Sequence, residues 1–294
     1  MRQQDRWAQW VLRRRDGDNA DVRARVAPLI GAYRDRVLDR AAITAGDVVL
    51  DVGTGDGLIG FGALNRVGPT GRVIFSDISE DLLTECWRRA TADGRVDQCR
   101  FVLASADDLR DVPGRSVDVV TTRSVLIYVR RKAAAFTEFF RVLRPGGRLS
   151  IFEPINGFAA TETRRGLFGL DMAPIEDLMQ RLLKVYEPLP PTEDPMLNFD
   201  ERDLLRMVRD AGFTGIELDY RAEIEVRAPL TTRDWDVLKK TAPNPLAPTY
   251  EEALALALNP AEREQVESYL RAALAAGAAG HRTMATAYLR ATRP

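Results

Sequence analysis

Short apolar runs separated by helix-like segments dominate the first half of the chain. Five such runs predict buried strands, and they cover residues 48–52, 71–77, 100–104, 117–122 and 148–152. Between the last two, apolar residues recur at the i, i+3, i+4 and i+7 spacing of a core-facing helix, which Pro145 and Gly146 are expected to stop. Strands alternating with helices predict an α/β fold with a parallel sheet, in which ligands bind at the carboxyl ends of the strands.

The alternation lapses after residue 154 and resumes near residue 198. Residues 155–197 contain a helical pattern around 175–186 followed by four prolines, and a segment of this length is typical of an inserted lid. Beyond it, Asp200 is predicted to cap a helix, and residues 215–226 alternate as a sixth strand.

A second insertion, mostly helical, is predicted at residues 231–280. One helix is expected near 235–240, and another is expected to begin at Asn259, with Pro260 at its first position. Residues 281–290 then supply the last strand. Together with the N-terminal segment, the two insertions are expected to form a helical cap.

A glycine turn follows the first predicted strand, and an acidic residue lies where that strand ends. Gly55, Gly57 and Gly60 satisfy a dinucleotide-binding pattern, but such a match alone is weak evidence. The carboxylates of Asp51 and Asp56 would repel a diphosphate from the amide groups of the turn, and they favour a cationic ligand. S-adenosylmethionine (SAM) carries a sulfonium and an ammonium group and no phosphate. We therefore predict SAM rather than NAD or FAD.

A second acid, Asp77, ends the next predicted strand. It lies about twenty residues beyond the glycine turn, the distance at which a strand–helix–strand unit brings a carboxylate to ribose hydroxyls. Asp77 is therefore predicted to bind the ribose. The alternative is that it caps the helix that begins immediately afterwards.

These motifs resemble those of class I SAM-dependent methyltransferases, and within them the small-molecule branch that includes the ubiquinone/menaquinone-biosynthesis C-methyltransferases. The resemblance covers about residues 41–154. Residues 51–57 look like the first motif of the family, Asp77 like its ribose-binding acid, and residues 143–147 like the turn before its fifth strand. It implies a Rossmann-like, seven-stranded, mostly parallel sheet with an antiparallel last strand, together with a helical cap.

One position departs from the family pattern. The family usually has an acid that accepts a hydrogen bond from the adenine amino group, and this chain has Ser105 there. Ser105 or Asp107 is expected to substitute, while the backbone N–H of Ala106 faces the adenine ring. The predicted cofactor-binding residues are Asp51, Gly53, Gly55, Gly57, Asp77, Ile78, Ser105, Ala106, Asp107 and Arg123.

The first forty residues carry apolar spacings that predict two or three short helices with one buried face. In the family such a segment often lies over the cofactor, which would place Tyr33, Arg34 and Arg36 near the methionine carboxylate; packing on the sheet edge is the alternative. The predicted segments are an N-terminal helical lid (1–40), the SAM-binding core (41–154), a cap insertion (155–197), the continued core (198–230), a second cap insertion (231–280) and the last core strand (281–294).

Composition narrows the class of partner. The chain has 294 residues, 45% of them hydrophobic and 29% charged, and its formal net charge is −1, with arginines interspersed among acids, so we predict no nucleic-acid partner. No apolar stretch approaches the roughly 20 residues that cross a bilayer, and the start lacks a signal peptide, which predicts a cytoplasmic protein without a membrane partner. Cys86 and Cys99 lack metal-ligand spacing and are interpreted as structural, so no metal site is predicted.

Catalysis by methyl transfer is an in-line displacement that depends on holding the nucleophile about 3–3.5 Å from the methyl group. A base is required only when the acceptor is mostly protonated. The single histidine, His281, opens the last predicted strand and is interpreted as structural. Glu153 is the best candidate for a base or a substrate-orienting group, with structural capping as the alternative. Tyr128 is a second candidate and is better suited to a pocket wall.

Asn156 and Trp235 are predicted to line the acceptor pocket. Arg123 is expected there too, or it positions the methionine end of SAM through its backbone. We predict a SAM-dependent methyltransferase that acts on a small, cyclic or secondary-metabolite acceptor at carbon, nitrogen or oxygen, with S-adenosylhomocysteine (SAH) as coproduct. The alternatives are an NAD-dependent oxidoreductase and a non-catalytic SAM-binding protein of the same fold. A Trp-bearing N-terminal helix would allow exchange within a homo-oligomer.

Overall fold

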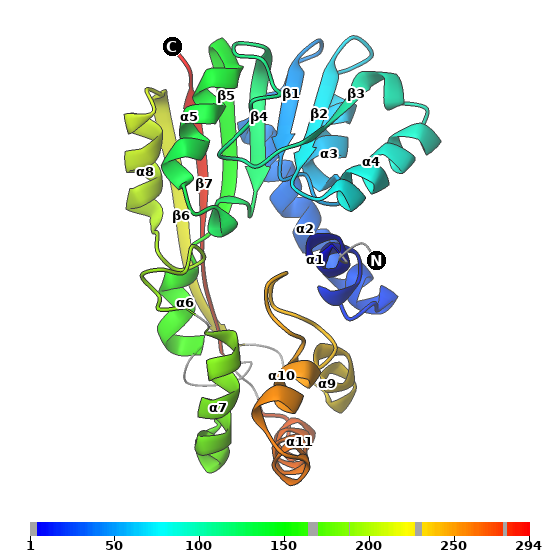
Figure 1. Cartoon of the computed structure of the whole chain (residues 1–294), viewed down its shortest axis with the longest axis vertical. Helices are drawn as coiled ribbons and strands as arrows, with labels where there is room; N and C mark the ends of the chain where they lie inside the picture. The colour runs from blue at the N-terminus through cyan, green and yellow to red at the C-terminus, as the bar shows by residue number, and fades with distance from the viewer. Residues whose placement is uncertain (1–4, 164–169, 188, 227–230, 279–280) are drawn as a thin grey trace. The chain divides into compact units, whose positions relative to one another are not determined.

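The computed structural model describes residues 5–163, 170–187, 189–226, 231–278 and 281–294. Within these residues, seven strands form one sheet in the order β3-β2-β1-β4-β5-β7-β6 (Figure 1). The strands are β1 (Val48–Val52), β2 (Arg72–Asp77), β3 (Cys99–Leu103), β4 (Val117–Arg123), β5 (Leu143–Pro154), β6 (Thr214–Val226) and β7 (His281–Thr292).

Strand direction confirms the predicted fold. Strand β1 pairs in parallel with β2 and β4, β2 pairs in parallel with β3, and β4 with β5. The last strand, β7, pairs antiparallel with β5, so that Glu153 lies opposite Ala287. The carboxyl ends of β1 to β5 therefore meet at one edge of the sheet, where open α/β sheets bind their ligands.

Helices cover this sheet through apolar faces that the sequence spacing predicts. Helices α3 (Leu58–Arg66) and α4 (Glu80–Ala92) pack on β1, β2 and β3, while α5 (Lys132–Val142) packs on β5 and on α8 (Glu201–Asp210) (Figure 1). The hydroxyl of Ser79 caps α4 by accepting the N–H of Leu82 at 3.1 Å. A capping box of Asp200 and Asp203 begins α8, as predicted for Asp200.

The predicted turn at residues 143–147 lies inside β5. Helix α5 ends at Val142, before Pro145 and Gly146, and Leu143 has extended dihedral angles as its C-cap. Leu143 pairs with Val117, and the register shifts between Val117 and Val119. The chain therefore enters the strand before the Pro-Gly pair, because pairing with β4 satisfies the backbone groups that a free turn would leave to water.

The N-terminal segment forms two helical stretches, within the predicted number, but the second is one long helix rather than a short one. Helix α1 (Arg6–Gln9) continues into a π-helical turn at Trp10–Arg14, and α2 (Ala20–Arg40) is one helix of 21 residues that contains Pro28. The last turns of α2 bury Val37 and Leu38, and the carbonyl of Val37 accepts the hydroxyl of Ser150 at 2.7 Å. Packing on the sheet thus stabilises this end of the helix.

The chain divides into two compact units. Unit 2 comprises residues 26–155, 195–221 and 286–294 and holds most of the sheet. Unit 1 comprises residues 1–25, 156–194 and 222–285, and its core of Trp235, Leu254, Val266 and Leu270 is among the most buried parts of the chain. Its helices include α6 (Asn156–Thr163), α7 (Glu176–Tyr186), α9 (Thr232–Leu238), α10 (Tyr250–Ala257) and α11 (Pro260–Ala275).

Local capping signals account for the helix starts in unit 1. Asn259 accepts the N–H of Glu262 at 3.0 Å, and Pro260 occupies the first turn, which confirms the predicted start of α11. Residues 164–169, 188 and 279–280 of the two predicted insertions, and residues 227–230 of the predicted continued core, lie outside the described residues. No helix in the described part of the chain is long and apolar enough to cross a bilayer. The cytoplasmic location and the homo-oligomer stay predictions.

Candidate functional site

A tight turn joins the carboxyl end of β1 to α3. The N–H of Thr54 donates to the carbonyl of Ser76 in β2 at 2.9 Å, and the N–H of Gly57 donates to the carbonyl of Thr54 at 2.9 Å. Residues 53–57 are thereby fixed to the neighbouring strand, and Gly57 precedes the first residue of α3. The start of α3 therefore lies at the carboxyl end of β1, on the edge where open α/β sheets bind their ligands.

The glycines of this turn meet different neighbours. A Cβ atom on Gly53 would lie 2.3 Å from Val125 Cγ2, and one on Gly57 would lie 2.4 Å from the ring of Phe61. Gly55 has φ +58°, and a Cβ atom there would meet no other atom within 4 Å. Crowding therefore explains Gly53 and Gly57, whereas Gly55 opens onto free space, the feature expected of a surface that a ligand approaches closely.

The Asp51 carboxyl group is almost entirely buried, with 1% of the residue exposed. It accepts the hydroxyl of Thr54 at 2.7 Å, the N–H of Gly60 at 2.9 Å and the hydroxyl of Thr121 at 2.9 Å. Burial raises the pKa of Asp51 to about 7. Through these hydrogen bonds Asp51 joins the turn to α3 and β4 and has a structural role. The contact of Asp51 with a bound cation stays a prediction.

Asp77 lies at the end of β2, next to the glycine turn. Its Oδ2 accepts the N–H of Gly55 at 2.9 Å, and its Oδ1 accepts the N–H of Ser79 at 3.0 Å. Ser79, not Asp77, is the N-cap of α4, so the capping alternative for Asp77 is wrong. The apolar side chain of the next residue, Ile78, is 49% exposed. A carboxylate and an exposed apolar side chain thus lie together beside the turn, an arrangement suited to a ribose and a purine ring.

The segment after β3 carries the predicted adenine contacts. The hydroxyl of Ser105 donates to Asp107 Oδ1, and the guanidinium of Arg131 donates to Asp107 Oδ2 at 2.9 Å. Ala106, between them, is 4% exposed. The structure therefore brings Ser105, Ala106 and Asp107 to the same edge of the sheet as Asp77.

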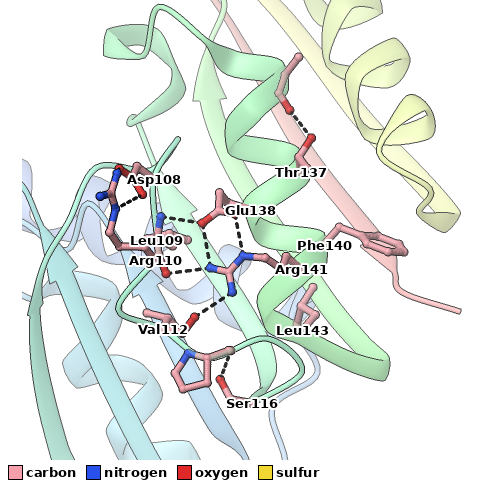
Figure 2. Close-up of polar contacts among 12 residues, drawn as sticks. Asp108, Leu109, Arg110, Val112, Ser116, Thr137, Glu138, Phe140, Arg141 and Leu143 are labelled. Atoms are coloured by element: carbon pink, nitrogen blue, oxygen red, sulfur yellow. Dashed lines mark hydrogen bonds and ion pairs between the residues drawn. The ribbon is translucent and has the colours of Figure 1, made fainter.

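Helix α5 fixes the end of the segment after β3 through hydrogen bonds, a role that the sequence pattern alone does not indicate. Arg141 donates to the carbonyls of Val112 and Leu109 at 3.0 and 2.8 Å, and Glu138 accepts the N–H of Leu109 at 2.7 Å (Figure 2). Glu138 and Arg141 also pair with each other. The i, i+3 spacing of Glu138 and Arg141 on one helix is the sequence signal for this pair. The apolar residues of the same helix indicate only a core-facing side.

Glu153 is fully buried at the end of β5. Its carboxylate accepts the N–H groups of Val125 and Leu126 at 2.9 Å each and that of Ile127 at 3.2 Å. Burial raises the pKa of Glu153 to about 7. These three bonds support the alternative that Glu153 caps structure, and they hold Val125 against Gly53 of the glycine turn. A role as base stays untested.

Stability is expected to depend on pH through Glu153. The folded chain binds the carboxyl proton with a pKa of about 7 against 4.5 for the free group, so its contribution is complete below about pH 4.5 and is lost as the pH rises through 7. Urea unfolding should show a free energy of unfolding that falls about 2 kcal/mol more between pH 5 and 7 in the wild type than in Glu153→Gln. Equal pH slopes for the two proteins would contradict this assignment.

Tyr128 lies in the short helical turn that follows β4. Burial first, and then the nearby Glu153, raise the pKa of Tyr128 above its ordinary value, so the phenol stays protonated near neutral pH. The Arg123 guanidinium lies 5.8 Å from the ring centre of Tyr33 and 5.7 Å from that of Phe152. Arg123 thus adds a positive charge beside two aromatic rings. The predicted role of Tyr128 as a base or a pocket wall stays a prediction.

Tyr33 and the neighbouring arginines pack on the sheet. The ring of Tyr33 stacks on Phe152 with 4.9 Å between the ring centres, and Arg34 pairs with Asp35 at 2.7 Å. Arg36 pairs with Asp219 of β6 at 3.0 Å and lies 4.0 Å from the ring centre of Tyr288. These contacts agree with packing on the sheet, and a contact with the methionine carboxylate stays a prediction.

The two predicted acceptor contacts outside the sheet belong to unit 1. Asn156 begins α6, and Trp235 lies in the core of that unit with 1% of its surface exposed. Trp235 therefore has a structural role that the sequence did not reveal, because an isolated tryptophan in a short helix does not show which of its neighbours cover it. Their contact with an acceptor stays a prediction. Cys86 is buried, as expected, and its thiol lies 3.4 Å from the Gly55 carbonyl.

Comparison with known proteins decides the family. The model of the ubiE/COQ5 methyltransferase family matches residues 30–223, about two thirds of the chain. The chain belongs to this family. It is therefore a class I SAM-dependent methyltransferase, as the motifs predict, and SAM is its cofactor.

Curated relatives agree with this assignment, and a solved structure shares the fold. The chain is 33% identical over 121 residues to the ubiquinone/menaquinone biosynthesis C-methyltransferase UbiE of Hydrogenovibrio crunogenus, covering 41% of this chain and 47% of that protein. It is 32% identical over 194 residues to UbiE of Roseobacter denitrificans, and the match covers 62% of this chain and 72% of that protein. The YcgJ protein of Bacillus subtilis has the same fold, with a TM-score of 0.53 and 15% identity over 89% of this chain and 98% of that one.

The residues around Gly55 suit SAM, because the structure leaves open space at this glycine. A Cβ atom on Gly55 would fill open space that the backbone leaves beside Asp77 and Ile78. The carboxylate provides acceptors for ribose hydroxyls, and Ile78 provides an exposed apolar surface for the adenine ring. An acid at this place would suit the ribose of NAD as well, so it is the family match that decides for SAM.

Proposed function

We propose that this chain transfers the methyl group of SAM to a small, cyclic acceptor bound at the carboxyl ends of β4 and β5. The observation that carries the proposal is the placement of charged and aromatic side chains along the sheet edge. Asp77 and the Ser105 segment lie on the β2 and β3 side of the glycine turn, whereas Arg123, Tyr128 and Phe152 lie on the β4 and β5 side. An adenosine on the first side leaves the second side for the acceptor.

When bound, SAM supplies an electrophilic methyl group on a positively charged sulfur. We propose that the amide groups of the turn around Gly55 hold the methionine part, that Asp77 accepts hydrogen bonds from the ribose, and that Ile78 and Ala106 flank the adenine. Gly53 and Gly57 shape the turn through close contacts with Val125 and Phe61. These groups orient the cofactor, and orientation is the main source of rate in a displacement of this kind.

The acceptor must bring its own nucleophile. Glu153 holds three backbone N–H groups, and Tyr128 stays protonated, so neither is arranged as a strong base near neutral pH. An enol-like carbon of an electron-rich ring reacts without a strong base once it is positioned. The relatives named as C-methyltransferases support a carbon acceptor. Tyr128 would then donate a hydrogen bond to a ring oxygen of the acceptor, and Arg123 would stabilise negative charge on it.

Calorimetry with SAM, SAH and NAD tests the cofactor half of the proposal. We expect binding of SAM and SAH and none of NAD. Transfer of a labelled methyl group from SAM to a compound in an extract of the producing cells tests the other half. Folded protein that binds neither SAM nor SAH, or that binds NAD instead, would overturn the proposal, and SAM binding without any transfer would favour the non-catalytic alternative.

A further inference from the structure

The loop after β4, residues 124–129, carries Tyr128 and has an unusual backbone. Ser124 has φ +56°, a conformation that residues with a side chain rarely adopt. The N–H groups of residues 125–127 all donate to the carboxyl group of Glu153. Backbone strained in this way persists only where the surrounding contacts fix it. The shape of this segment, the β4 loop, therefore depends on partners from other elements.

The ammonium group of Lys132 fixes the other end of the β4 loop. Lys132 is the first residue of α5 and is 6% exposed. Its Nζ donates to the carbonyl of Val129, the last residue of the loop, at 3.0 Å. It also donates to the carbonyl of Pro195 at 2.8 Å and to Oδ1 of Asn198 at 3.1 Å. The three protons thus join the β4 loop to the segment where the chain re-enters unit 2.

The stability of α5 does not account for a lysine at this position. Removing a charged group from water costs several kcal/mol unless its partners compensate, and a cation at the start of a helix opposes the helix dipole. The three oxygens that accept its protons are neutral, and the ring of Phe199 lies 4.7 Å from Nζ. An apolar side chain of similar length would fill the same place. What the ammonium group adds is a fixed position for these oxygens.

Glu153 and Lys132 act on the β4 loop together. Glu153, on β5, accepts the N–H groups at the start of the loop, and Lys132, on α5, holds the carbonyl at its end. Burial raises the pKa of Glu153, and the charge of Lys132 opposes that rise, so the two groups are close enough to interact. Tyr128 lies between the two held ends. Displacement of either end therefore moves Tyr128.

We propose that Lys132 is a positioning residue for methyl transfer, because it fixes the β4 loop and thereby places Tyr128 against the acceptor. This inference rests on the proposed function, in which Tyr128 donates a hydrogen bond to the acceptor. Lys132 acts through the carbonyl of Val129 rather than on the acceptor itself. Asp77 and the glycine turn belong to other strands. Loss of the ammonium group should therefore lower the rate of transfer and spare the binding of the cofactor.

Lys132→Met tests the proposal, because it keeps the length of the side chain and removes the charge and its hydrogen bonds. The assay is transfer of a labelled methyl group from saturating SAM into an extract of the producing cells. The rate is expressed per SAH site counted by calorimetry, which leaves unfolded protein out of the comparison. We expect this rate to fall about tenfold, because a displacement of about 1 Å is costly to a positioned reaction, and the SAH affinity to stay within about twofold.

Arg293→Met is the matched control at the opposite end of α5. The guanidinium group of Arg293 donates to the carbonyls of Phe140, Arg141 and Leu143 and lies 4.4 Å from the ring centre of Phe140. Arg293 is 8% exposed, so it too is a buried cation that holds one end of this helix. Its end lies at the start of β5, away from the ligand edge. Arg293→Met should keep the wild-type rate per SAH site. An equal loss of rate in both variants would give Lys132 a merely structural role and overturn the inference.

A double-mutant cycle tests whether Lys132 acts through Tyr128. Lys132→Met should lower the rate about tenfold in the wild-type background and no more than about twofold in Tyr128→Phe, which already lacks the hydroxyl. The full loss in both backgrounds would overturn the inference. Lys132→Arg keeps a cation with several N–H donors and should recover part of the rate.

Asn198→Ala is a milder variant that removes one of the three oxygens. Asn198 is exposed, so its truncation leaves the core intact. The rate should fall about threefold, as for the loss of one hydrogen bond, and not fall further in Tyr128→Phe. A wild-type chain that binds no SAH, or that binds SAH without any transfer, overturns the proposed function. Wild-type transfer with an unchanged rate in folded Lys132→Met, or in Asn198→Ala where Lys132→Met does not fold, overturns this inference alone.

Discussion

Replacement of Asp77 by alanine is expected to weaken SAH binding about a hundredfold. A carboxylate that accepts hydrogen bonds from two ribose hydroxyls loses charge-assisted bonds that contribute about 3 kcal/mol together, and 1.4 kcal/mol corresponds to a factor of ten. The same carboxylate accepts the N–H groups of Gly55 and Ser79, so its loss also loosens the glycine turn. Isothermal calorimetry with SAH measures the loss directly.

Two further variants separate the ribose contact from the effect on the turn. Asp77→Asn keeps one carbonyl oxygen and the size of the side chain, so it should lose less affinity than alanine. Asp81→Asn removes a carboxylate from an exposed residue in the first turn of α4 and should bind SAH as the wild type does. An Asp77→Ala protein that remains folded and retains wild-type affinity would show that the ribose lies elsewhere.

Alanine at Gly55 is expected to abolish SAM binding while the protein stays folded. A Cβ atom at this position meets no other protein atom within 4 Å. Under the proposed function it projects into the space that the methionine part of SAM requires. The positive φ of +58° adds conformational strain of about 1–2 kcal/mol, which lowers stability without blocking a ligand. We expect the affinity for SAM to fall at least about a hundredfold, beyond the effect of strain.

Gly94 offers a matched control for the strain. It has φ +64°, a Cβ atom there would also meet no other atom within 4 Å, and it lies in the turn after α4, away from the ligand edge. Gly94→Ala should therefore lower the melting temperature as much as Gly55→Ala does and leave SAM binding intact. Equal losses of SAM binding in the two variants would assign the effect to strain. Normal SAM binding by Gly55→Ala would show that SAM does not bind at this turn.

The glycine turn after β1 and the position of Asp77 beside it could be predicted from the sequence because their determinants are local. A buried strand followed by Gly53, Gly55 and Gly57 needs no distant contact to form a turn, and an acid at the end of the next strand arrives beside it through the geometry of one strand–helix–strand unit. The antiparallel last strand came from the family resemblance instead, since no local pattern in residues 281–292 states which neighbour it pairs with.

The acceptor half depended on tertiary contacts. Glu153 could be a base or a cap on the sequence alone, and only the fold shows the N–H groups of Val125, Leu126 and Ile127 converging on it. The burial of Trp235 likewise appears only in the fold, because helices separated by many residues cover it.

The sequence by itself determined the strand–helix alternation, the glycine turn after β1 and the position of Asp77 beside it. Short-range periodicity and glycine conformation dictate these features. Only the tertiary structure decided which polar groups bond to one another: the burial of Asp51, the bonds of Glu153, and the alignment of Ser105, Asp107 and Arg131. The physical reason is that a side chain's hydrogen-bonding capacity is known from its type, whereas its partners are set by backbone groups that folding brings from elsewhere in the chain.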